Sequence, residues 1–255
     1  MQRNLKNKVV WITGAGGGMG QHIASTLSKL HSKVILSDIN EQSLKKVSQN
    51  CTYYSSIKPL DITKINDVKT VVKEIENDFG QLDIVINAAG MNIQNRDWDD
   101  IQQNDWDQVF KVNINGMFYW CKSALQLMKK QNDWLIINIS SWAGNHISYL
   151  SGTSYIASKH AINAMTETIN MKYCNVGIRA CSICPGEAST PLLDQRPVPL
   201  SQEEKDLMLQ VEDISETVAF VAQREKHVCV NQITISPTHN RLYLWLIITE
   251  FCPAF

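Results

Sequence analysis

The sequence predicts one α/β domain built on a doubly wound parallel sheet with helices on both faces. Apolar runs such as Val9–Thr13 and Trp134–Ile139 are typical of strands buried on both faces, and segments with helical periodicity separate such runs. The glycine-rich turn Gly14–Gly20 joins the first run to an amphipathic helix. The 255 residues, of which 44% are hydrophobic and 19% charged, suffice for one sizeable core.

Charge and composition exclude several classes of partner. The formal net charge is −1, and the lysines and arginines are scattered, so no basic surface for nucleic acid or anionic lipid is expected. No apolar run reaches the roughly 18 residues that a membrane helix needs, and the polar segment Met1–Lys8 does not resemble a signal peptide. Seven cysteines without framework spacing fit reduced thiols. We expect a cytoplasmic protein without a membrane span.

The glycine-rich turn is the first candidate binding site. Glycines have no Cβ, so their backbone can approach a pyrophosphate closely, and the start of the following helix attracts its negative charge. The spacing Thr13-Gly14-x-x-x-Gly18-x-Gly20 differs from the ordinary G-x-G-x-x-G pattern. The alternative is a purely structural turn. We predict that Gly14, Gly18, Met19 and Gly20 bind a dinucleotide cofactor.

The second strand, Lys33–Asp38, ends in an acid that lies 18 residues after Gly20. A carboxylate about 20 residues beyond the glycine turn is suited to the adenosine ribose of NAD. It would repel the 2′-phosphate of NADP, and neither Ser37 nor Ile39 is an arginine that could neutralise that phosphate. We therefore predict NAD as the cofactor. The alternative for Asp38 is a solvated acid at a strand end.

The following segments supply small and polar residues at strand ends. The run Leu60-Asp61-Ile62 precedes a helix that extends to about Phe79. A fourth buried strand then begins at Leu82 and ends in Asn87-Ala88-Ala89-Gly90, whose small side chains leave room for a ligand. Taken alone, Asn87 is more often a turn residue.

Residues 104 to 130 have helical periodicity that is interrupted by Asn113, Asn115 and Gly116. These three residues weaken a helix, and positions that break a local rule tend to lie at functional sites. A kink or a functional side chain is therefore expected there. The residues alone do not choose between the two asparagines.

The strand Trp134–Ile139 ends at Ser140-Ser141, at the edge where open α/β sheets bind their ligands. Farther on, Tyr155 and Lys159 stand four residues apart, which on a helix places a phenol and an ammonium one turn apart on one face. A nearby positive charge favours the phenolate, so Tyr155 can exchange a proton near neutral pH. A core tyrosine and a solvated lysine are the alternative interpretation.

The C-terminal third completes the sheet and covers the site. The helix continues to about Cys174, and the strand Gly177–Cys184 is followed by Pro185-Gly186. Cys181 and Cys184 point to opposite faces of a strand, so they cannot share a metal ion, and the six histidines show no ligand spacing. No metal site is expected. The proline-rich stretch 187–212, helical over 201–208, is interpreted as a substrate lid.

The end of the chain carries a last strand and an apolar tail. The strand lies within 229–237, and Leu242–Thr249 is too short to span a bilayer and too apolar to remain in water. Its burial in a subunit interface and its burial against the lid both remain open. We therefore divide the chain into a domain over 1–240 and a tail over 241–255.

These motifs resemble those of the classical short-chain dehydrogenases/reductases, which adopt a single-domain Rossmann-type fold. The resemblance rests on the spacing of the glycine turn, on Asn138-Ile-Ser-Ser141, on Tyr155-x-x-x-Lys159 and on two further loops. It implies that Ser141 polarises the substrate oxygen, that Tyr155 is the general acid/base, and that Lys159 binds the ribose and lowers the tyrosine pKa. It also identifies Asn113 as the fourth catalytic residue, which holds a water beside the lysine.

The same resemblance implies the rest of the cofactor site and the reaction. Asp61 and Ile62 would lie at the adenine, the turn Asn87–Gly90 would line the cofactor cleft, and the loop that contains Pro185, Gly186 and Thr190 would hold the nicotinamide. The implied activity is hydride transfer between NAD(H) and an alcohol or ketone, by a homodimer or homotetramer. The rival hypothesis is a catalytically silent NAD-binding sensor or scaffold.

Overall fold

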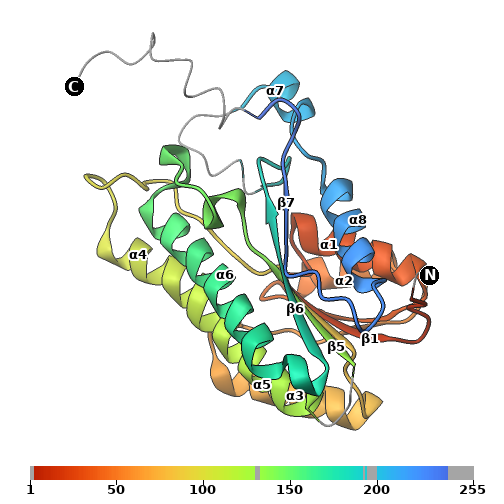
Figure 1. Cartoon of the computed structure of the whole chain (residues 1–255). Coiled ribbons are helices and arrows are strands. Elements are labelled where there is room, and N and C mark those ends of the chain that lie inside the picture. Colours follow the sequence, from red (N-terminus) through yellow and green to blue (C-terminus); the bar gives the residue numbers. More distant parts are fainter. Residues whose placement is uncertain (1–2, 130–132, 192, 194–199, 241–255) are drawn as a thin grey trace.

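A computed structural model describes residues 3–129, 133–191, 193 and 200–240. Its centre is a seven-stranded parallel sheet with the strand order β3-β2-β1-β4-β5-β6-β7 (Figure 1). The strands are β1 (Val9–Thr13), β2 (Lys33–Ser37), β3 (Ser55–Ile57), β4 (Ile84–Asn87), β5 (Trp134–Ile139), β6 (Ile178–Pro185) and β7 (Gln232–Ile235). The predicted doubly wound parallel sheet is therefore confirmed.

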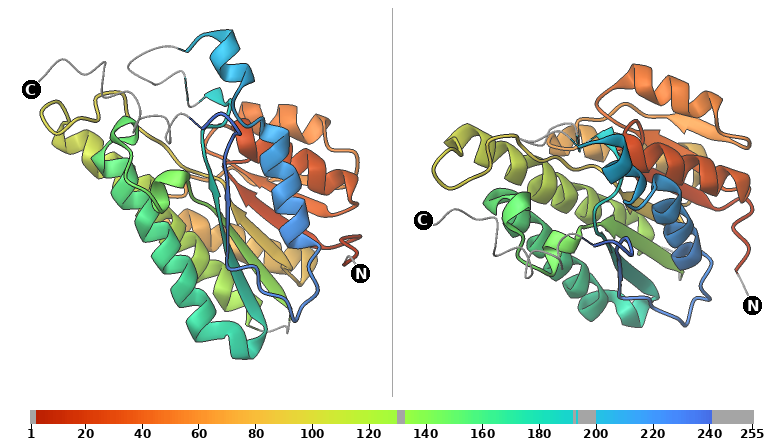
Figure 2. Two further views of the ribbon diagram at one scale, coloured as in Figure 1. Left: turned by 45° about the horizontal axis from the view of Figure 1, so that its top comes forward. Right: turned by 90° about the horizontal axis from the view of Figure 1, so that it is seen from above.

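Helices cover both faces of this sheet (Figure 2). They are α1 (Gly18–Lys29), α2 (Glu41–Gln49), α3 (Ile65–Phe79), α4 (Gln103–Phe110), α5 (Met117–Met128), α6 (Thr153–Tyr173), α7 (Gln202–Asp206) and α8 (Val211–Ala222). One hydrophobic cluster joins the sheet to α3, α5 and α6, and a second joins it to α1, α2 and α8. Each of these helices thus buries its apolar side against one of the two faces of the sheet.

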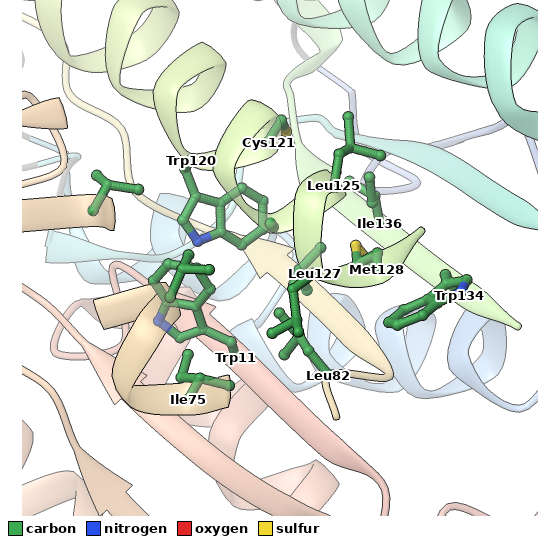
Figure 3. Packing of buried hydrophobic residues seen from close by; sticks show 14 of the residues in the cluster. Trp11, Ile75, Leu82, Trp120, Cys121, Leu125, Leu127, Met128, Trp134 and Ile136 are labelled. Carbon is green, nitrogen blue, oxygen red and sulfur yellow. The ribbon is translucent and has the colours of Figure 1, made fainter. Parts of the chain in front are cut away.

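The alternation of side chains along β1 shows how one strand serves both clusters. Val10 and Ile12 belong to the cluster with α1, whereas Trp11 belongs to the cluster with α5. The Trp11 ring packs against Trp120 with ring centroids 5.5 Å apart (Figure 3). Its buried indole N–H donates to Ser37 Oγ at 2.9 Å, so burial of the ring leaves no hydrogen-bond donor without a partner. A continuous apolar run is therefore the right sequence for this strand.

The helical segment over 104–130 contains the interruption that its sequence predicts. Between α4 and α5 the chain forms a π-helical turn, η1 (Lys111–Gly116), that includes Asn113, Asn115 and Gly116. A Cβ on Gly116 would lie 2.9 Å from Ile62 Cγ2, so glycine allows this turn to approach the loop after β3. The π-turn therefore packs closely against the loop that contains Ile62.

The predicted elements agree with the structure in place and differ slightly in length. β2 ends at Ser37, so Asp38 follows the strand, and β7 covers only four residues of the stretch 229–237. The predicted helix over 201–208 is the short α7, which begins with a capping box from Ser201 and Glu204. The apolar run Leu242–Thr249 lies outside the described residues, as do residues 192 and 194–199 of the predicted lid.

The sheet topology determines where a ligand can bind. The chain runs outward from β1 through β2 to β3 and then returns to build the other half from β4 to β7. Open α/β sheets bind ligands beyond the carboxyl ends of their strands at such a reversal. No helix in the described part of the chain is long and apolar enough to cross a bilayer.

Candidate active site

The glycine turn after β1 is shaped by close backbone approaches. Gly14 has a positive φ of 68°, and a Cβ there would lie 2.6 Å from the nitrogen of Ala89. A Cβ on Gly20 would overlap the carbonyl oxygen of Gly14. A Cβ on Gly18 would lie 3.0 Å from Pro191 Cδ and 3.3 Å from Thr190 Cβ. These glycines let α1, the turn after β4 and the loop after β6 meet around one opening.

That opening is a cleft of about 380 Å³ at the carboxyl ends of β1, β2 and β4. Eleven of the residues predicted to bind the cofactor line it, namely Gly14, Gly18, Met19, Gly20, Asp38, Asp61, Ile62, Ala88, Ala89, Gly90 and Thr190. Segments far apart in the sequence therefore converge on one cleft. Val112 of η1 and Pro191 also line the cleft. Sequence reasoning missed them because neither belongs to a polar or glycine motif.

Two carboxylates, Asp38 and Asp61, line the cleft. Asp38 accepts a hydrogen bond from the backbone N–H of Gly16 at 3.1 Å, which ties the end of β2 to the glycine turn. Asp61 accepts from both the backbone N–H and the hydroxyl of Thr63, at 3.0 and 2.7 Å. Partial burial acts to raise the pKa of Asp61, but these bonds and the Lys64 charge outweigh it and hold the pKa below its ordinary value.

A second, smaller pocket of about 110 Å³ adjoins this cleft and contains Ser141 and Tyr155. Met19 and Thr190 line both cavities, so the two cavities share a wall. The small pocket is also lined by Asn92, Arg96, Ser140, Trp142, Ala143, Ser148, Leu150, Ser151, Pro185, Gly186, Glu187, Ala188 and Leu193. The predicted hydroxyl pair therefore lies beside the predicted cofactor cleft, where one substrate could reach both.

Lys159 lies behind Tyr155 on the same face of α6. Its side chain is buried, with Nζ 5.4 Å from the centroid of the Tyr155 ring and donating to the carbonyl oxygen of Ile139 at 3.0 Å. Burial lowers the pKa of the ammonium to about 8, while the neighbouring Cys184 acts in the opposite direction. The lysine is thus cationic at neutral pH and close to its titration.

The structure distinguishes the two asparagines of η1. Asn113 is buried, and its amide accepts from the backbone N–H of Met91 and donates to the carbonyl oxygen of Met91, both at 2.9 Å. It also donates to Ser158 Oγ at 3.0 Å. A Cβ on Gly90 would lie 3.5 Å from both Asn113 Oδ1 and Lys159 Nζ. Asn115 is exposed. The π-turn therefore directs Asn113 inward, against Met91 and against Ser158, the residue before Lys159.

The remaining predicted residues lie at the margins of the two cavities. Asn87 accepts from the Thr13 hydroxyl at 3.0 Å, so it joins β4 to β1 below the cleft. Pro185 and Gly186 line the small pocket and are absent from the lining of the larger cleft.

Cys181 and Cys184 are buried, and burial raises the pKa of the Cys181 thiol to about 12. Within the described residues, no group of His, Cys, Asp or Glu could hold a metal ion.

Comparisons with known proteins identify the family of this chain. The family model for short chain dehydrogenases matches residues 8–198. An uncharacterized oxidoreductase of Staphylococcus aureus is 34% identical over 91% of this chain and 98% of its own length. An uncharacterized oxidoreductase of Staphylococcus epidermidis is 30% identical over the same shares.

Solved structures support the fold at lower identity. A 3-ketoacyl-(acyl-carrier-protein) reductase from Brucella melitensis complexed with NADH has a TM-score of 0.84 at 22% identity, covering 92% of this chain and 99% of that one. An alcohol dehydrogenase from Thermococcus sibiricus complexed with 5-hydroxy-NADP has a TM-score of 0.81 at 23% identity, covering 92% and 98%. The chain belongs to the short-chain dehydrogenase family of oxidoreductases.

Proposed function

We propose that the protein transfers a hydride between NAD(H) and a secondary alcohol or ketone group of a small or medium-sized substrate. The observation that carries this proposal is the shared wall of the two cavities. Ser141 and Tyr155 line a small pocket that shares Met19 and Thr190 with the cleft at the glycine turn. A substrate oxygen between the two hydroxyls has its carbon on the cofactor side.

Each catalytic residue has a separate task in this proposal. Ser141 donates a hydrogen bond to the substrate oxygen, and Tyr155 gives or takes its proton. The Lys159 cation favours the phenolate of Tyr155 and contacts the cofactor ribose. Asn113 holds Met91 and Ser158 in place beside that lysine and binds the water that connects it to solvent. Bound NAD(H) supplies or accepts the hydride.

The cleft fits a nicotinamide dinucleotide in shape and in charge. Without a Cβ at Gly14 and Gly20, the glycine turn packs closely against its own backbone and the turn after β4, and it leads into the N-terminus of α1, which attracts phosphate. Asp38 lines the same cleft, beside Gly16. Its carboxylate accepts from a ribose hydroxyl and repels a 2′-phosphate, which favours NAD over NADP. The solved structures named above contain NADH in one case and an NADP derivative in the other, so the fold alone supports either cofactor.

Replacement of Tyr155 tests the proposal. Tyr155→Phe removes one oxygen, so the fold and NAD affinity should be retained while turnover falls by roughly 10² to 10⁴, the range for loss of a general acid/base. The measurement is steady-state turnover over a panel of secondary alcohols and ketones, with NAD binding followed by calorimetry. Near wild-type turnover by the variant would place the catalytic centre elsewhere.

The second hypothesis is an NAD-binding sensor or scaffold without catalysis. Calorimetric binding of NAD without turnover of any alcohol or ketone in the panel would favour it. Ser141 and Tyr155 line one pocket, and Lys159 Nζ lies 5.4 Å from the centroid of the Tyr155 ring. This set argues against the second hypothesis, because a silent module has no need of it.

We also infer how the protein is organised in the cell. The exposed apolar side chains Phe118 on α5 and Met171 on α6 support assembly into a homodimer or homotetramer. Six cysteines in the described part of the chain are free thiols, which supports a cytoplasmic location. Residues 1–240 would form the dehydrogenase domain with its lid over 187–212, and 241–255 the apolar tail.

A further inference from the structure

Asn163 lies on the same face of α6 as the two residues proposed for proton transfer. Tyr155, Lys159 and Asn163 follow one another at intervals of four residues, which places them on successive turns of one helix face. The function proposed above gives roles to Tyr155 and Lys159 and none to Asn163. The hydrogen bonds that Asn163 donates lead instead to the segment that follows Ser141.

That segment is a 3₁₀ turn, η2 (Trp142–Gly144), which begins directly after Ser141. Asn163 Nδ2 donates to the carbonyl oxygen of Gly144 and to Oδ1 of Asn145, both at 2.9 Å. The two N–H bonds of one amide group suffice for both contacts. Asn163 thus joins α6 to the end of the turn that follows Ser141.

Hydrogen bonds within η2 connect its end to Ser141. The N–H of Gly144 donates to the carbonyl oxygen of Ser141 at 2.8 Å. The N–H of Ala143 donates to Ser141 Oγ at 3.2 Å. Both the backbone and the hydroxyl of Ser141 are therefore tied to the turn that Asn163 contacts.

The turn and α6 approach each other too closely for a side chain at position 144. A Cβ on Gly144 would lie 2.7 Å from Asn163 Nδ2, 2.7 Å from Ser140 Oγ and 2.9 Å from the carbonyl oxygen of Lys159. Ser140 Oγ itself donates to that carbonyl oxygen at 3.2 Å. The turn therefore packs against the backbone of Lys159 as well as against the Asn163 amide, and it can move little without losing these contacts.

The edge strand β7 contacts the same turn through Asn145. Asn145 Nδ2 donates to Thr234 Oγ1 at 3.1 Å, and Gln232 Nε2 donates to Asn145 Oδ1 at 2.7 Å. All three residues are exposed, so these bonds exchange readily for bonds with water. Asn163 is half-buried and Gly144 is buried, so the bond between them is the stronger support of the turn.

We propose that Asn163 is a positioning residue that keeps Ser141 at the distance from Tyr155 that the reaction requires. Ser141 and Tyr155 line the same pocket, but Ser141 follows β5 and Tyr155 belongs to α6. Their separation therefore depends on contacts between the two segments, and Asn163 makes such a contact one turn beyond Lys159. A displaced Ser141 hydroxyl loses its hydrogen bond to the substrate oxygen, and small displacements at a site cost large factors in rate. This inference rests on the function proposed above.

A double-mutant cycle with Ser141 tests the inference. Asn163→Leu keeps a side chain of similar size and removes both donors. It should lower kcat at least ~10-fold and change NAD affinity less than about twofold, because Asn163 is absent from the lining of the cofactor cleft. In a Ser141→Ala background the same change should lower kcat less than about threefold, because no hydroxyl remains to be positioned. Equal losses in the two backgrounds would overturn the inference.

Asn170 on the same helix supplies the matched control. Its amide donates to the carbonyl oxygen of Ala180 at 2.8 Å and accepts from the N–H of Ala180 at 2.7 Å, so it joins α6 to β6. Asn170→Leu should lower the melting temperature at least as much as Asn163→Leu and leave kcat within about twofold of the wild type. Losses of kcat that follow the losses of stability in both variants would make Asn163 a structural residue only.

Amide hydrogen exchange decides the inference even without turnover. The N–H groups of Ala143 and Gly144 should exchange at least ~10-fold faster in Asn163→Leu than in the wild type, because the turn loses its contact with α6. They should exchange at the wild-type rate in Asn170→Leu. Unchanged exchange in Asn163→Leu would overturn the inference. Wild-type turnover by Ser141→Ala, with faster exchange in Asn163→Leu, would refute the proposed role of Ser141 and leave the contact of Asn163 with the turn intact.

Discussion

At the scale of single residues, Lys159 is functionally useful and costly to the fold. Its pKa in the folded protein is about 8, against an ordinary value of 10.5. Below pH 8 both folded and unfolded chains carry the charge, and the folded chain has it buried. The difference in pKa corresponds to a reduction of about 3 kcal/mol in the free energy of unfolding. This reduction disappears as the pH rises from 8 to 10.5, because only the unfolded chain then binds the proton.

Lys159→Met should therefore stabilise the cofactor-free protein while it abolishes turnover and weakens NAD binding. We expect a gain of roughly 1 to 3 kcal/mol in the free energy of unfolding at pH 7, because a buried charge is replaced by an apolar chain. The gain should shrink toward pH 10. Urea unfolding of both proteins at pH 7 and pH 10 measures it, and a variant less stable than the wild type at pH 7 would contradict this account.

Asp38 gives a second prediction at this scale. The wild type should bind NAD⁺ about 100-fold or more tightly than NADP⁺, since a carboxylate beside a phosphate is a like-charge contact. Asp38→Asn should narrow that gap, mainly by improving NADP⁺ binding, and it keeps an oxygen that can accept from the Gly16 N–H. Titration calorimetry with both cofactors is the measurement. Tighter binding of NADP⁺ by the wild type would refute the assignment of Asp38.

The residues of the site differ in how far the sequence reveals them. Motif spacing predicts a role for Ser141, Tyr155, Lys159 and the glycine turn, because each of these motifs lies within a few residues of the chain. It did not reveal Arg96 or Glu187, whose places in the pocket depend on loops that meet only after the sheet has formed. It also left Asn113 and Asn115 equivalent until the resemblance to a family separated them, since only burial in the π-turn distinguishes their environments.

At the scale of elements, long apolar runs were predictable and short or half-exposed ones were not. All five residues of β1 are buried, and its predicted and observed bounds agree. The three residues of β3 are half-buried, and this strand lies at the edge of the sheet, so no apolar run marks it. α8 was not identified either. It packs against α1, and only that contact explains why its apolar residues are buried.

The start of α1 can be tested with two glycines, Gly17 at the N-cap and Gly20 in the first turn. Gly20→Ala should destabilise the protein by about 1 to 3 kcal/mol and abolish NAD binding, because its Cβ would overlap the Gly14 carbonyl oxygen. Gly17→Ala is the matched control. Its Cβ would lie 3.5 Å from the same oxygen, an ordinary contact, so its stability should stay within about 1 kcal/mol of the wild type. Thermal unfolding that ranks the two variants in the reverse order would contradict this geometry.

The π-turn η1 provides the matched pair of asparagines. Asn113→Ala removes the partners of the Met91 backbone and of Ser158, so we expect a loss of about 1 to 3 kcal/mol in stability. The turnover number should fall at least ~10-fold, because the backbone at Met91 and Ser158, the residue before Lys159, lose a shared partner. Asn115→Ala, at an exposed position, should change kcat less than twofold. Equal effects of the two variants on kcat would remove Asn113 from the site.

At the scale of the whole molecule, the surface of α5 and α6 predicts self-association. Inward-facing residues of both helices are buried against the sheet, yet Phe118 on α5 is 46% exposed and Met171 on α6 is 76% exposed. Helices that also carry apolar side chains on the outer face usually contact another protein surface. A second copy of the same helices is the simplest such surface, because a twofold axis makes every contact occur twice.

We therefore expect a dimer or tetramer of the 28.9 kDa chain at micromolar concentration. Phe118→Glu should shift the population toward smaller species, because it places a charge in an apolar contact on both sides of a twofold axis. Lys46→Glu, an exposed change on α2 at the other face of the sheet, should leave the assembly unchanged. Light scattering coupled to size-exclusion chromatography measures the masses. A wild-type monomer at these concentrations would show that α5 and α6 do not form such an interface, and assembly unaffected by Phe118→Glu would place the interface on another face of the molecule.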